Sequence, residues 1–348
     1  MVLRKLYIRI GFIAALLFCF QIMDAQYNFS QLDQVLTAQK RILGGNVSVL
    51  IYKNENIIYE NNLGNYNKNT LEPIASCSKW LTAALVMTFV DEGKLSLEDN
   101  VWKYLPEFSK NGMENIKIKN CLSHTTGIES EPITLASLIA RKKYKTLAEE
   151  VTGFASKPIV GESGQVFAYS SIGLNIAGRI LEVLSGKDFE TLFQERIAKP
   201  LEMGSTTFTN KTACNPSGGA LSTASDYMKF LSMILHEGTY NGKQILSKKS
   251  IEMMQISRTV DVKVLYTPQG AEIFEYGFGE WIQEKDKTGK SIVVSSPGLF
   301  GTFPFIDLKR NYAAIVFVKN LKTKNRRITD SAIKNAIDQS LEKSGKEL

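Results

Sequence analysis

The chain has few histidines and few cysteines, which narrows the chemistry open to it. Only two of its 348 residues are histidines, His124 and His236, so the sequence disfavours a histidine-built metal centre. Of the four cysteines, Cys19 lies in the N-terminal segment, and the other three show no Cys-x-x-Cys spacing. An odd remainder without that spacing argues against a disulfide scaffold and against a zinc site. We therefore expect no metal and no other cofactor.

Two common catalytic motifs are also missing. The sequence has no G-x-S-x-G nucleophile elbow and no G-x-x-x-x-G-K phosphate loop. A Ser-His-Asp triad would need one of the two histidines, and His236, in "MILHEG", is most simply a C-terminal capping or surface residue of a helix. A serine nucleophile in this chain would therefore need lysine or tyrosine as its proton acceptor.

No strong block of one charge occurs, although the net charge is +7 and the pI is near 9.0. The basic residues are scattered apart from short runs at residues 141–145 and 322–327. We interpret these runs as solvated faces and expect no nucleic-acid partner, with nucleic-acid binding as the alternative. At 348 residues and 44% hydrophobic content, the chain is large enough for two subdomains.

Beyond the N-terminus, no stretch is apolar enough to span a membrane. Residues 1–25 combine a basic start, "MVLRK", an apolar stretch at 10–22 and a plausible cleavage point after Ala25. This pattern predicts a signal peptide and a periplasmic or secreted protein. An uncleaved anchor is the alternative, and only then would the chain contact a membrane. A lipoprotein is disfavoured because the bulky Phe18 precedes Cys19.

The hydrophobic pattern predicts an α+β fold. Strands at 46–54 and 56–64 form a hairpin with a tight turn at Asn54 and Glu55. Residues 82–274 are mostly helices and loops, including helical segments at 137–154 and 189–201, and the chain is rich in strands after Glu275 before a closing helix. We expect an antiparallel sheet formed by the N- and C-terminal segments and flanked by helices, with an inserted helical subdomain. The α/β part would comprise about 26–80 and 272–348, and the helical part 81–271, with a ligand cleft between them.

The stretch "SCSKWLTAALVMTFV" contains Ser76 and Lys79, one helical turn apart. The segment after Lys79 is apolar on nearly every face, so the helix should be buried. Ser76 would lie at its N-terminus, where the helix dipole favours developing negative charge. Partial burial of Lys79 would lower its pKa and suit it to proton transfer. The alternative is that Ser76 or Ser78 caps the helix while Lys79 reaches the surface.

The Ser-x-x-Lys spacing alone is weak evidence. It also occurs at Ser331/Lys334 and Ser340/Lys343, in the polar tail helix, where we expect no catalytic role. The surrounding sequence is more informative, because "SCSKWLTAALVMTFVDEGKLSLEDNVWKYLPEF" resembles the serine β-lactamase-like hydrolases. These comprise class C β-lactamases, penicillin-binding D-Ala-D-Ala carboxypeptidases and family VIII esterases. The resemblance continues in "CLSHTTGI", in residues 167–208, in "GGALSTASDYMKF" and in "YGFGEWI".

This resemblance, which covers nearly all of residues 26–348, implies a β-lactamase/penicillin-binding-protein-like fold and hydrolysis through an acyl-enzyme. The family's second motif, Tyr-x-Asn, here reads Tyr169-Ser170-Ser171. By resemblance, Tyr169 is the general base, polarised by Lys79, although a tyrosine packed in the core is the alternative. Ser171 replaces the family's substrate-binding Asn, and its hydroxyl can still donate and accept hydrogen bonds.

The third motif departs further from the family, which places Lys or His before the glycine of a strand along the cleft. Here the stretch reads Ser296-Pro297-Gly298. Pro297 has no N–H and is tolerable where the strand edge faces an open cleft, and Gly298 permits close approach of a substrate. The resemblance implies substrate contacts from Ser296 and Gly298, and an oxyanion hole built from the amides of Ser76 and Leu299.

The missing cation bears on the substrate. Without it, a free carboxylate should bind less well, which favours an esterase, amidase or peptidase acting on a small molecule or peptide over an efficient β-lactamase. The alternative is a catalytically impaired penicillin-binding-like module with a binding or regulatory role. By resemblance, His124 lies in a structural turn. Cys77, beside Ser76, is interpreted as buried packing because no histidine is evidently near to activate it.

Overall fold

The computed structural model describes residues 27–209, 212–321 and 326–344. The predicted signal peptide lies outside these residues. The chain divides into two compact units, one from residues 1–36 and 331–348 and the other from residues 37–330. Among the described residues, no helix combines the length and the apolar character that a membrane crossing requires. Lys334, the lysine of the Ser331/Lys334 pair, lies in the first of these units and is ion-paired with Asp338 at 2.8 Å.

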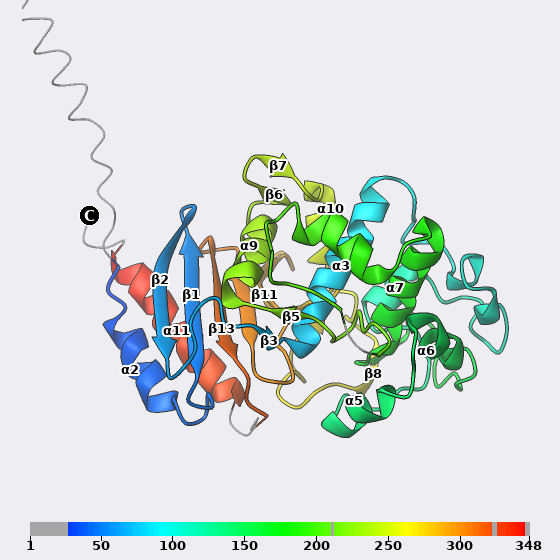
Figure 1. Cartoon of the computed structure of the whole chain (residues 1–348), viewed down its shortest axis with the longest axis horizontal. Helices are drawn as coiled ribbons and strands as arrows, with labels where there is room; N and C mark the ends of the chain where they lie inside the picture. The colour runs from blue at the N-terminus through cyan, green and yellow to red at the C-terminus, as the bar shows by residue number, and fades with distance from the viewer. Residues whose placement is uncertain (1–26, 210–211, 322–325, 345–348) are drawn as a thin grey trace, which may run out of the picture. The chain divides into compact units, whose positions relative to one another are not determined.

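The larger unit contains a seven-stranded sheet with the strand order β2-β1-β13-β12-β11-β10-β9. Every neighbouring pair is antiparallel. The strands are β1 (Val47–Lys53), β2 (Asn56–Leu63), β9 (Glu275–Tyr276), β10 (Trp281–Lys285), β11 (Ser291–Ser295), β12 (Phe303–Asp307) and β13 (Tyr312–Val318). Figure 1 shows blue N-terminal strands beside orange C-terminal ones. The predicted antiparallel sheet from two distant segments is therefore confirmed.

The pairing of β1 explains why the two distant segments come together. β1 pairs with β2 on one side and with β13 on the other, so its apolar sequence VSVLIYK is mostly buried. The β1–β2 turn has positive φ angles of 51° at Asn54 and 62° at Glu55. Two successive residues with positive φ match the tight hairpin turn that favours the twist of antiparallel strands. The predicted hairpin is thus present at the predicted turn.

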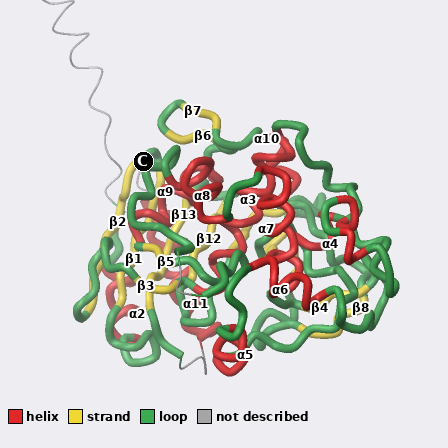
Figure 2. The backbone as a smooth tube through the Cα atoms, turned by 45° about the vertical axis from the view of Figure 1, so that its right-hand side comes forward, coloured by secondary structure: helices red, strands yellow, loops and turns green. Residues whose placement is uncertain are grey.

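Helices from the middle of the chain complete the larger unit. α9 (Ala224–Leu235) packs against β1, β12 and β13, and α3 (Ser78–Asp91) contacts α7 (Ile172–Ser185), as the views in Figures 1 and 2 show. The other helices of this part are α4 (Ile118–Leu122), α5 (Leu135–Arg141), α6 (Leu147–Phe154), α8 (Phe189–Phe193) and α10 (Lys248–Met254). α3 and α7 are the longest helices of this region; α4, α6 and α8 contact α7, and α8 and α10 contact α3.

Two predicted helical segments are interrupted. Residues 137–154 form two helices, α5 and α6, because the hydroxyls of Thr134 and Thr146 each accept a hydrogen bond from a backbone N–H in the first turn of a new helix. Residues 189–201 form α8 followed by a π-helical turn at Gln194–Ala198. The middle region also contains short strands that periodicity did not reveal, including β4 (Val166–Ala168), which pairs in parallel with β8 (Lys263–Tyr266).

Candidate active site

The candidate site is built at the start of helix α3. A 3₁₀ turn at Ala75–Cys77 carries Ser76 and leads directly into the helix. Ala75 has a φ of +46°, a left-handed conformation that non-glycine residues seldom adopt. Residues 78–89 of α3 are all buried, as its apolar sequence predicts. The chain is therefore buried from Ile74 onward, and Ser76 and Lys79 both lie within this buried segment.

Ser78 ties this turn to a neighbouring loop. Its hydroxyl donates to the carbonyl of Ala75 at 2.6 Å and accepts from the amide of Ala220 at 3.0 Å. No side chain caps the start of α3. The alternative in which Ser76 or Ser78 serves as the helix cap is therefore not what the structure shows.

Lys79 is completely buried, with an exposed fraction of 0%. Its Nζ donates to Oγ of Ser76 at 3.1 Å and to the backbone carbonyl of Ser217 at 2.7 Å. Burial lowers the pKa of Lys79 to about 7, and the neighbouring Cys77 opposes this shift only in part. The amine is therefore close to half-deprotonated at neutral pH and lies within hydrogen-bonding distance of a serine hydroxyl.

Tyr169, which links β4 to α7, is the third member of the site. Nζ of Lys79 lies 4.9 Å from the centroid of its ring. Burial raises the pKa of Tyr169 above its usual value, while hydrogen bonds with the Ser76 hydroxyl and the Trp281 indole act in the opposite direction. The structure thus brings Ser76, Lys79 and Tyr169 together, with the pKa values of the amine and the phenol displaced in opposite senses.

Aromatic side chains surround Tyr169. Its ring centroid lies 4.6 Å from that of His124 and 5.1 Å from that of Trp281. Trp281 in turn packs edge-on against Tyr276 at 4.8 Å, and Phe167 contacts both of these rings. This wall excludes water from one side of Tyr169. The sequence analysis did not identify Trp281, because a tryptophan on a strand is more often a core residue than part of a site.

His124 is part of this aromatic wall and has a polar contact at each ring nitrogen. Its Nδ1 accepts a hydrogen bond from the amide of Ser170 at 3.4 Å, and its Nε2 lies 3.3 Å from the hydroxyl of Tyr276. Burial, assisted by the nearby Lys79, lowers the pKa of His124 well below its ordinary value. A neutral ring with Nε2 protonated fits both contacts. The geometry agrees with the structural role predicted for His124.

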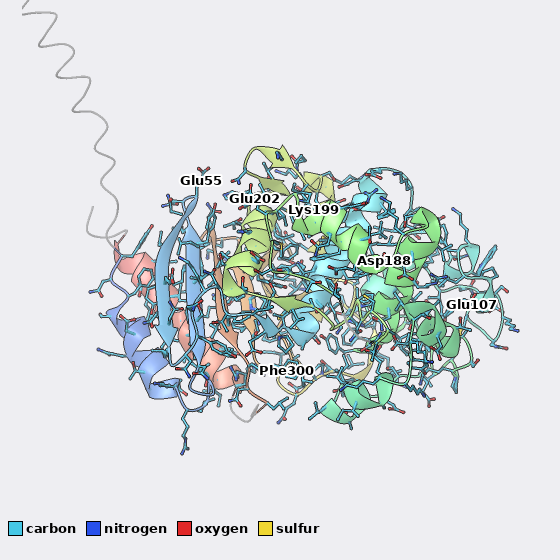
Figure 3. All side chains as sticks on the ribbon, in the orientation of Figure 1. Glu55, Glu107, Asp188, Lys199, Glu202 and Phe300 are labelled. Carbon is cyan, nitrogen blue, oxygen red and sulfur yellow. The ribbon has the colours of Figure 1, made fainter. Side chains whose placement is uncertain are left out.

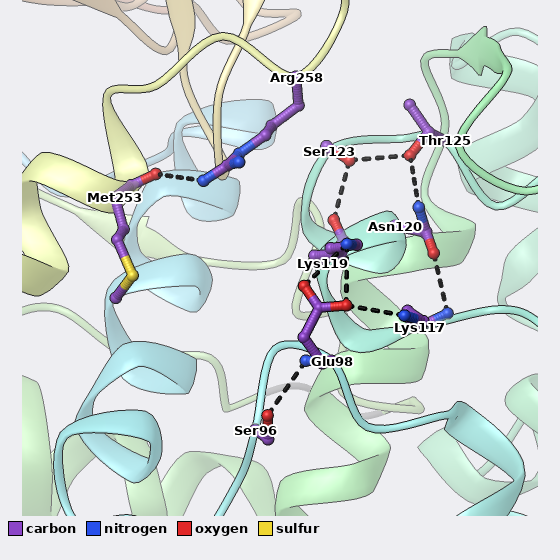
Figure 4. Close-up of polar contacts among 9 residues, drawn as sticks. All are labelled: Ser96, Glu98, Lys117, Lys119, Asn120, Ser123, Thr125, Met253 and Arg258. Atoms are coloured by element: carbon purple, nitrogen blue, oxygen red, sulfur yellow. Dashed lines mark hydrogen bonds and ion pairs between the residues drawn. The ribbon is translucent and has the colours of Figure 1, made fainter.

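Hydrogen bonds among neighbouring side chains stabilise the turn that carries His124 (Figure 4). Nδ2 of Asn120 donates to Oγ1 of Thr125 at 3.2 Å, and Oγ1 of Thr125 lies 2.9 Å from Oγ of Ser123. His124 itself has a φ of +58°. These contacts keep the histidine in a left-handed conformation that a non-glycine residue adopts at a cost.

The third motif follows strand β11, and its serine hydroxyl bonds to backbone carbonyls. Ser296 is only 2% exposed, and its hydroxyl lies 3.1 Å from the carbonyl of Gly279 and 3.3 Å from that of Ser76. It is not among the residues that line the pocket. The contact between Ser296 and a substrate remains a prediction. The hydroxyl of Ser296 connects the motif to the turn that carries Ser76.

Gly298 and Leu299 complete this motif. The amide of Gly298 donates to the carbonyl of Thr302, and the amide of Gly301 donates to Gly298, both at 2.8 Å. Leu299 lies between them and lines the pocket, and its amide has no acceptor among the described residues. Phe300, the next residue, marks this turn in Figure 3. The oxyanion hole from the amides of Ser76 and Leu299 remains a prediction.

The pocket brings polar and apolar groups together around Ser76. Its lining residues are Ala75, Ser76, Lys79, Ile133, Leu138, Ser171, Asn215, Ser217, Gly218 and Leu299. Lys79 is the only basic residue among these lining residues, and none of them is acidic. Ser171 is among the lining residues and Gly298 is not, and their contacts with a substrate remain predictions. Across the part of the chain that the structure describes, no cluster of three or more His, Cys, Asp or Glu residues could hold a metal ion.

Several pocket residues escaped the sequence analysis. Asn215 and Ser217 lie in the loop "CNPSGG", Ile133 lies just before α5, and Leu138 lies within α5. Pro, Ser and Gly in that loop indicate a turn but do not say which part of the fold it contacts. Asn215 lines the pocket, and its Oδ1 accepts a hydrogen bond from Oγ of Ser217 at 2.8 Å. Neither the composition nor the spacing of this loop indicates that it lies beside Ser76.

The buried Ser-x-x-Lys pair and its sheet-and-helix frame define a serine β-lactamase-like protein. The family model for Beta-lactamase matches residues 29–337, and the chain therefore belongs to this family. It is 23% identical over 284 residues to the D-alanyl-D-alanine-carboxypeptidase/endopeptidase AmpH of Escherichia coli K12, with 74% of this chain and 73% of AmpH covered. It is 25% identical over 323 residues to protein Rv1367c of Mycobacterium tuberculosis, with 75% and 80% covered.

Solved structures confirm the fold. A putative β-lactamase from Bacteroides dorei superposes with a TM-score of 0.78 at 28% identity, covering 89% of this chain and 98% of that one. EstCE1, a hydrolase with promiscuous acyltransferase activity, gives a TM-score of 0.73 at 18% identity, covering 89% and 99%. The predicted β-lactamase/penicillin-binding-protein-like fold is thus confirmed, and the family is of the serine hydrolase type.

Proposed function

We propose that the protein is a serine hydrolase that cleaves a neutral ester or amide through an acyl-enzyme on Ser76. One observation carries the proposal: the fully buried amine of Lys79 lies 3.1 Å from the Ser76 hydroxyl. A buried lysine that is partly neutral at physiological pH can accept a proton from a serine, which an exposed lysine cannot do efficiently. The residues Ser76, Lys79 and Tyr169 would share the chemistry.

The displaced pKa values suggest how protons move. Lys79, with its pKa lowered to about 7, takes the proton as Ser76 attacks the substrate carbonyl, while Tyr169 stays a neutral phenol because its pKa is raised. The amides of Ser76 and Leu299 would hold the oxyanion. When the bond to the leaving group breaks, Tyr169 gives that group its proton and recovers one from Lys79. This division differs from the resemblance, which makes Tyr169 the base.

Deacylation reverses these roles with water as the nucleophile. Lys79, again a neutral amine, takes a proton from water as its oxygen attacks the acyl carbonyl. The Ser76–acyl bond then breaks, and the serine oxygen recovers a proton from Lys79 through Tyr169. Both half-reactions return the three residues to their starting protonation states, so no further group is needed.

The pocket composition suggests the substrate class. Apart from Lys79, its lining residues include no cation for a substrate carboxylate, and Ile133, Leu138 and Leu299 form apolar walls. These features support an esterase, amidase or peptidase over an efficient β-lactamase. The names of relatives are compatible with this, since AmpH is described as a carboxypeptidase and endopeptidase and EstCE1 as a hydrolase. We further propose a small-molecule or peptide substrate, no nucleic-acid partner, and export directed by residues 1–25.

A matched pair of esters tests the substrate class. p-Nitrophenyl butyrate and the p-nitrophenyl monoester of succinic acid differ mainly in a terminal carboxylate. We expect the neutral ester to have a kcat/KM about 10-fold or more higher, because no second cation in the pocket compensates the carboxylate's desolvation. The Ser76→Ala variant is the control for background hydrolysis. A preference for the carboxylated ester, or rapid hydrolysis of a chromogenic cephalosporin, would overturn this assignment.

The pH dependence of turnover tests the role of Lys79. Because its pKa is lowered to about 7, the neutral amine becomes the major form above that pH. We therefore expect kcat/KM for a neutral ester to rise tenfold per pH unit at acid pH and to level off above an apparent pKa near 7. Stopped-flow or plate assays from pH 5 to 9 measure this limb. A flat profile over that range would show that no such group governs attack.

A second candidate, an impaired binding module, is favoured only by the altered motifs at Ser171 and Ser296. Ester turnover that is lost in both Lys79→Ala and Tyr169→Phe would exclude it. Absence of turnover on every ester, amide and D-amino-acid peptide, combined with saturable ligand binding, would support it.

A further inference from the structure

A continuous set of buried hydrogen bonds connects Lys79 to an ion pair behind the pocket. Lys79 donates to the carbonyl of Ser217 at 2.7 Å, and the amide of Ser217 donates to Oδ1 of Asn175 at 3.0 Å. Nδ2 of Asn175 donates to Oε2 of Glu150 at 3.1 Å. Nε of Arg141 donates to the other carboxylate oxygen of Glu150 at 2.7 Å. The four links run from α5 through α6 and α7 to α3.

We propose that Arg141, Glu150 and Asn175 are positioning residues that aim the amine of Lys79 at Ser76. This inference rests on the proposed function, in which the Lys79 amine is the base. We call the three side chains the Arg141–Glu150–Asn175 relay. They do not touch the reacting atoms. Their effect passes through the backbone of Ser217, whose carbonyl binds the amine.

The peptide unit before that carbonyl is held from both sides. Its N–H, on Ser217, is bound by Asn175, and its C=O, on Pro216, accepts from Oγ1 of Thr82 at 2.6 Å. Thr82 lies on α3, three residues after Lys79. The two bonds clamp the peptide between α3 and α7, so the direction of the next carbonyl, on Ser217, is fixed relative to Lys79. Loss of the Asn175 bond would leave only one side of this clamp.

Orientation matters because a neutral amine has one lone pair. In the neutral form, Lys79 donates an N–H to the Ser217 carbonyl, and this bond restricts the lone pair to the two remaining tetrahedral positions on Nζ. The Ser76 hydroxyl, at 3.1 Å, must lie along one of these directions to give up its proton. A small rotation of the carbonyl would turn the lone pair away, and displacements of about 1 Å by remote mutations can cost about 100-fold in rate.

The relay also supports the loop that carries Ser217. Arg141 donates to the carbonyl of Ala213 at 2.9 Å and to that of Cys214, in addition to its bonds with Glu150. Glu150 is only 3% exposed, so this ion pair pays a desolvation cost that an apolar pair would avoid. Every polar group along the path has a partner, which is the condition under which buried networks hold one geometry.

The relay begins at a helix that lines the pocket. Leu138 of α5 faces the pocket, and Arg141 lies one turn further along the same helix. No residue of α5 is buried, and Arg141 bonds this helix to Glu150 and to the carbonyls of Ala213 and Cys214. A substrate that contacts Leu138 would therefore contact α5, the helix whose Arg141 donates to Glu150.

Steady-state kinetics of Asn175→Leu and Glu150→Gln on a neutral ester test the relay. We expect kcat to fall about 10- to 100-fold with KM changed by less than about 3-fold, since the pocket walls remain. The carbonyl bond favours the ammonium form, so weakening it should move the acid limb of kcat to lower pH. Glu150→Asp, which keeps the carboxylate, should recover part of the lost kcat.

The matched control is Glu92→Gln. Glu92 forms a similar two-bond pair with Arg196, at 2.8 and 3.0 Å, but at the other end of α3. This variant should leave kcat and the pH limb unchanged. A purely structural role for Asn175 and Glu150 would lower the melting temperature without changing kcat or the pH limb, and that result would overturn the relay. If Asn175→Leu does not fold, the kcat and the pH limb of Glu150→Gln alone test the relay.

The outcome can be separated from a failure of the proposed function. Turnover that persists in Ser76→Ala would refute the acyl-enzyme proposal whatever the relay variants do. Turnover that requires Ser76 but is indifferent to Asn175→Leu and Glu150→Gln would refute the relay alone.

Discussion

The Lys79→Met variant is expected to lose turnover and to become more stable than the parent protein. Methionine fills nearly the same volume but carries no group that can accept the Ser76 proton. We expect kcat/KM to fall by about 10⁴-fold or more, as for loss of an essential member of a catalytic unit. Ester hydrolysis with Ser76→Ala as the reference for background measures this loss.

The gain in stability follows from the direction of the pKa shift. Burial lowers the pKa of Lys79 from 10.5 to about 7, so the unfolded chain binds more protons between these values and the parent becomes more stable as pH rises through them. Below pH 7 the parent carries the full cost of a buried ammonium. Methionine removes that cost but leaves the Ser217 carbonyl without the Lys79 hydrogen bond. This loss destabilises the variant by about 1–3 kcal/mol and offsets part of the gain. We expect a net gain of about 1–3 kcal/mol at pH 6, smaller at pH 9.

Urea unfolding of both proteins at pH 6 and pH 9 measures the difference in the free energy of unfolding. A variant that is less stable than the parent at both pH values, by the same amount, would show that Lys79 is not desolvated in the folded state. Lys79 would then lack the lowered pKa that allows its amine to act as a base at neutral pH.

Substitution of Gly298 by valine is expected to disrupt the site from the opposite side. A Cβ at Gly298 would lie 2.4 Å from the carbonyl oxygen of Ile74 and 3.2 Å from Sγ of Cys77. Because the first of these contacts is with backbone, the main chain must move. That movement would carry the amide of Leu299 away from the Ser76 turn. We expect kcat to fall about 100- to 1,000-fold, the range found when one oxyanion donor is lost.

The matched control for this variant is Gly204→Ala, because a Cβ at Gly204 meets nothing within 4 Å. Its kcat should equal that of the parent. Thermal unfolding separates the two effects of Gly298→Val: we expect destabilisation of about 1–3 kcal/mol, too small to unfold the protein at 25 °C. An unchanged kcat for Gly298→Val would remove Leu299 from the proposed oxyanion hole.

The sequence was sufficient for the frame of the site. Alternation and turn residues predicted the β1–β2 hairpin, and the continuous apolar run after Lys79 predicted the burial of α3. These patterns involve neighbouring or regularly spaced residues, so they do not depend on which distant segments pack together. Burial of the helix then implies burial of Lys79, which is why Ser76 and Lys79 could be singled out from the other Ser-x-x-Lys pairs.

The sequence was insufficient for the walls of the site. Asn215 and Ser217 reach the pocket from a loop whose composition marks a turn but not its place in the fold. The relay partners Glu150 and Asn175 lie on different helices, and only tertiary packing brings them together. For Ser296, the sequence predicted a place next to the site but not the partners of the hydroxyl. Its hydroxyl points to backbone carbonyls, a choice set by the neighbouring Gly279 and Ser76.

Covalent labelling with a p-nitrophenyl phosphonate, followed by peptide mass spectrometry, tests the central proposal most directly. The acyl-enzyme account expects one phosphonyl group per chain, on Ser76, with no labelling in Ser76→Ala and greatly slowed labelling in Lys79→Met. An adduct on another residue, or labelling undiminished in Ser76→Ala, would contradict it.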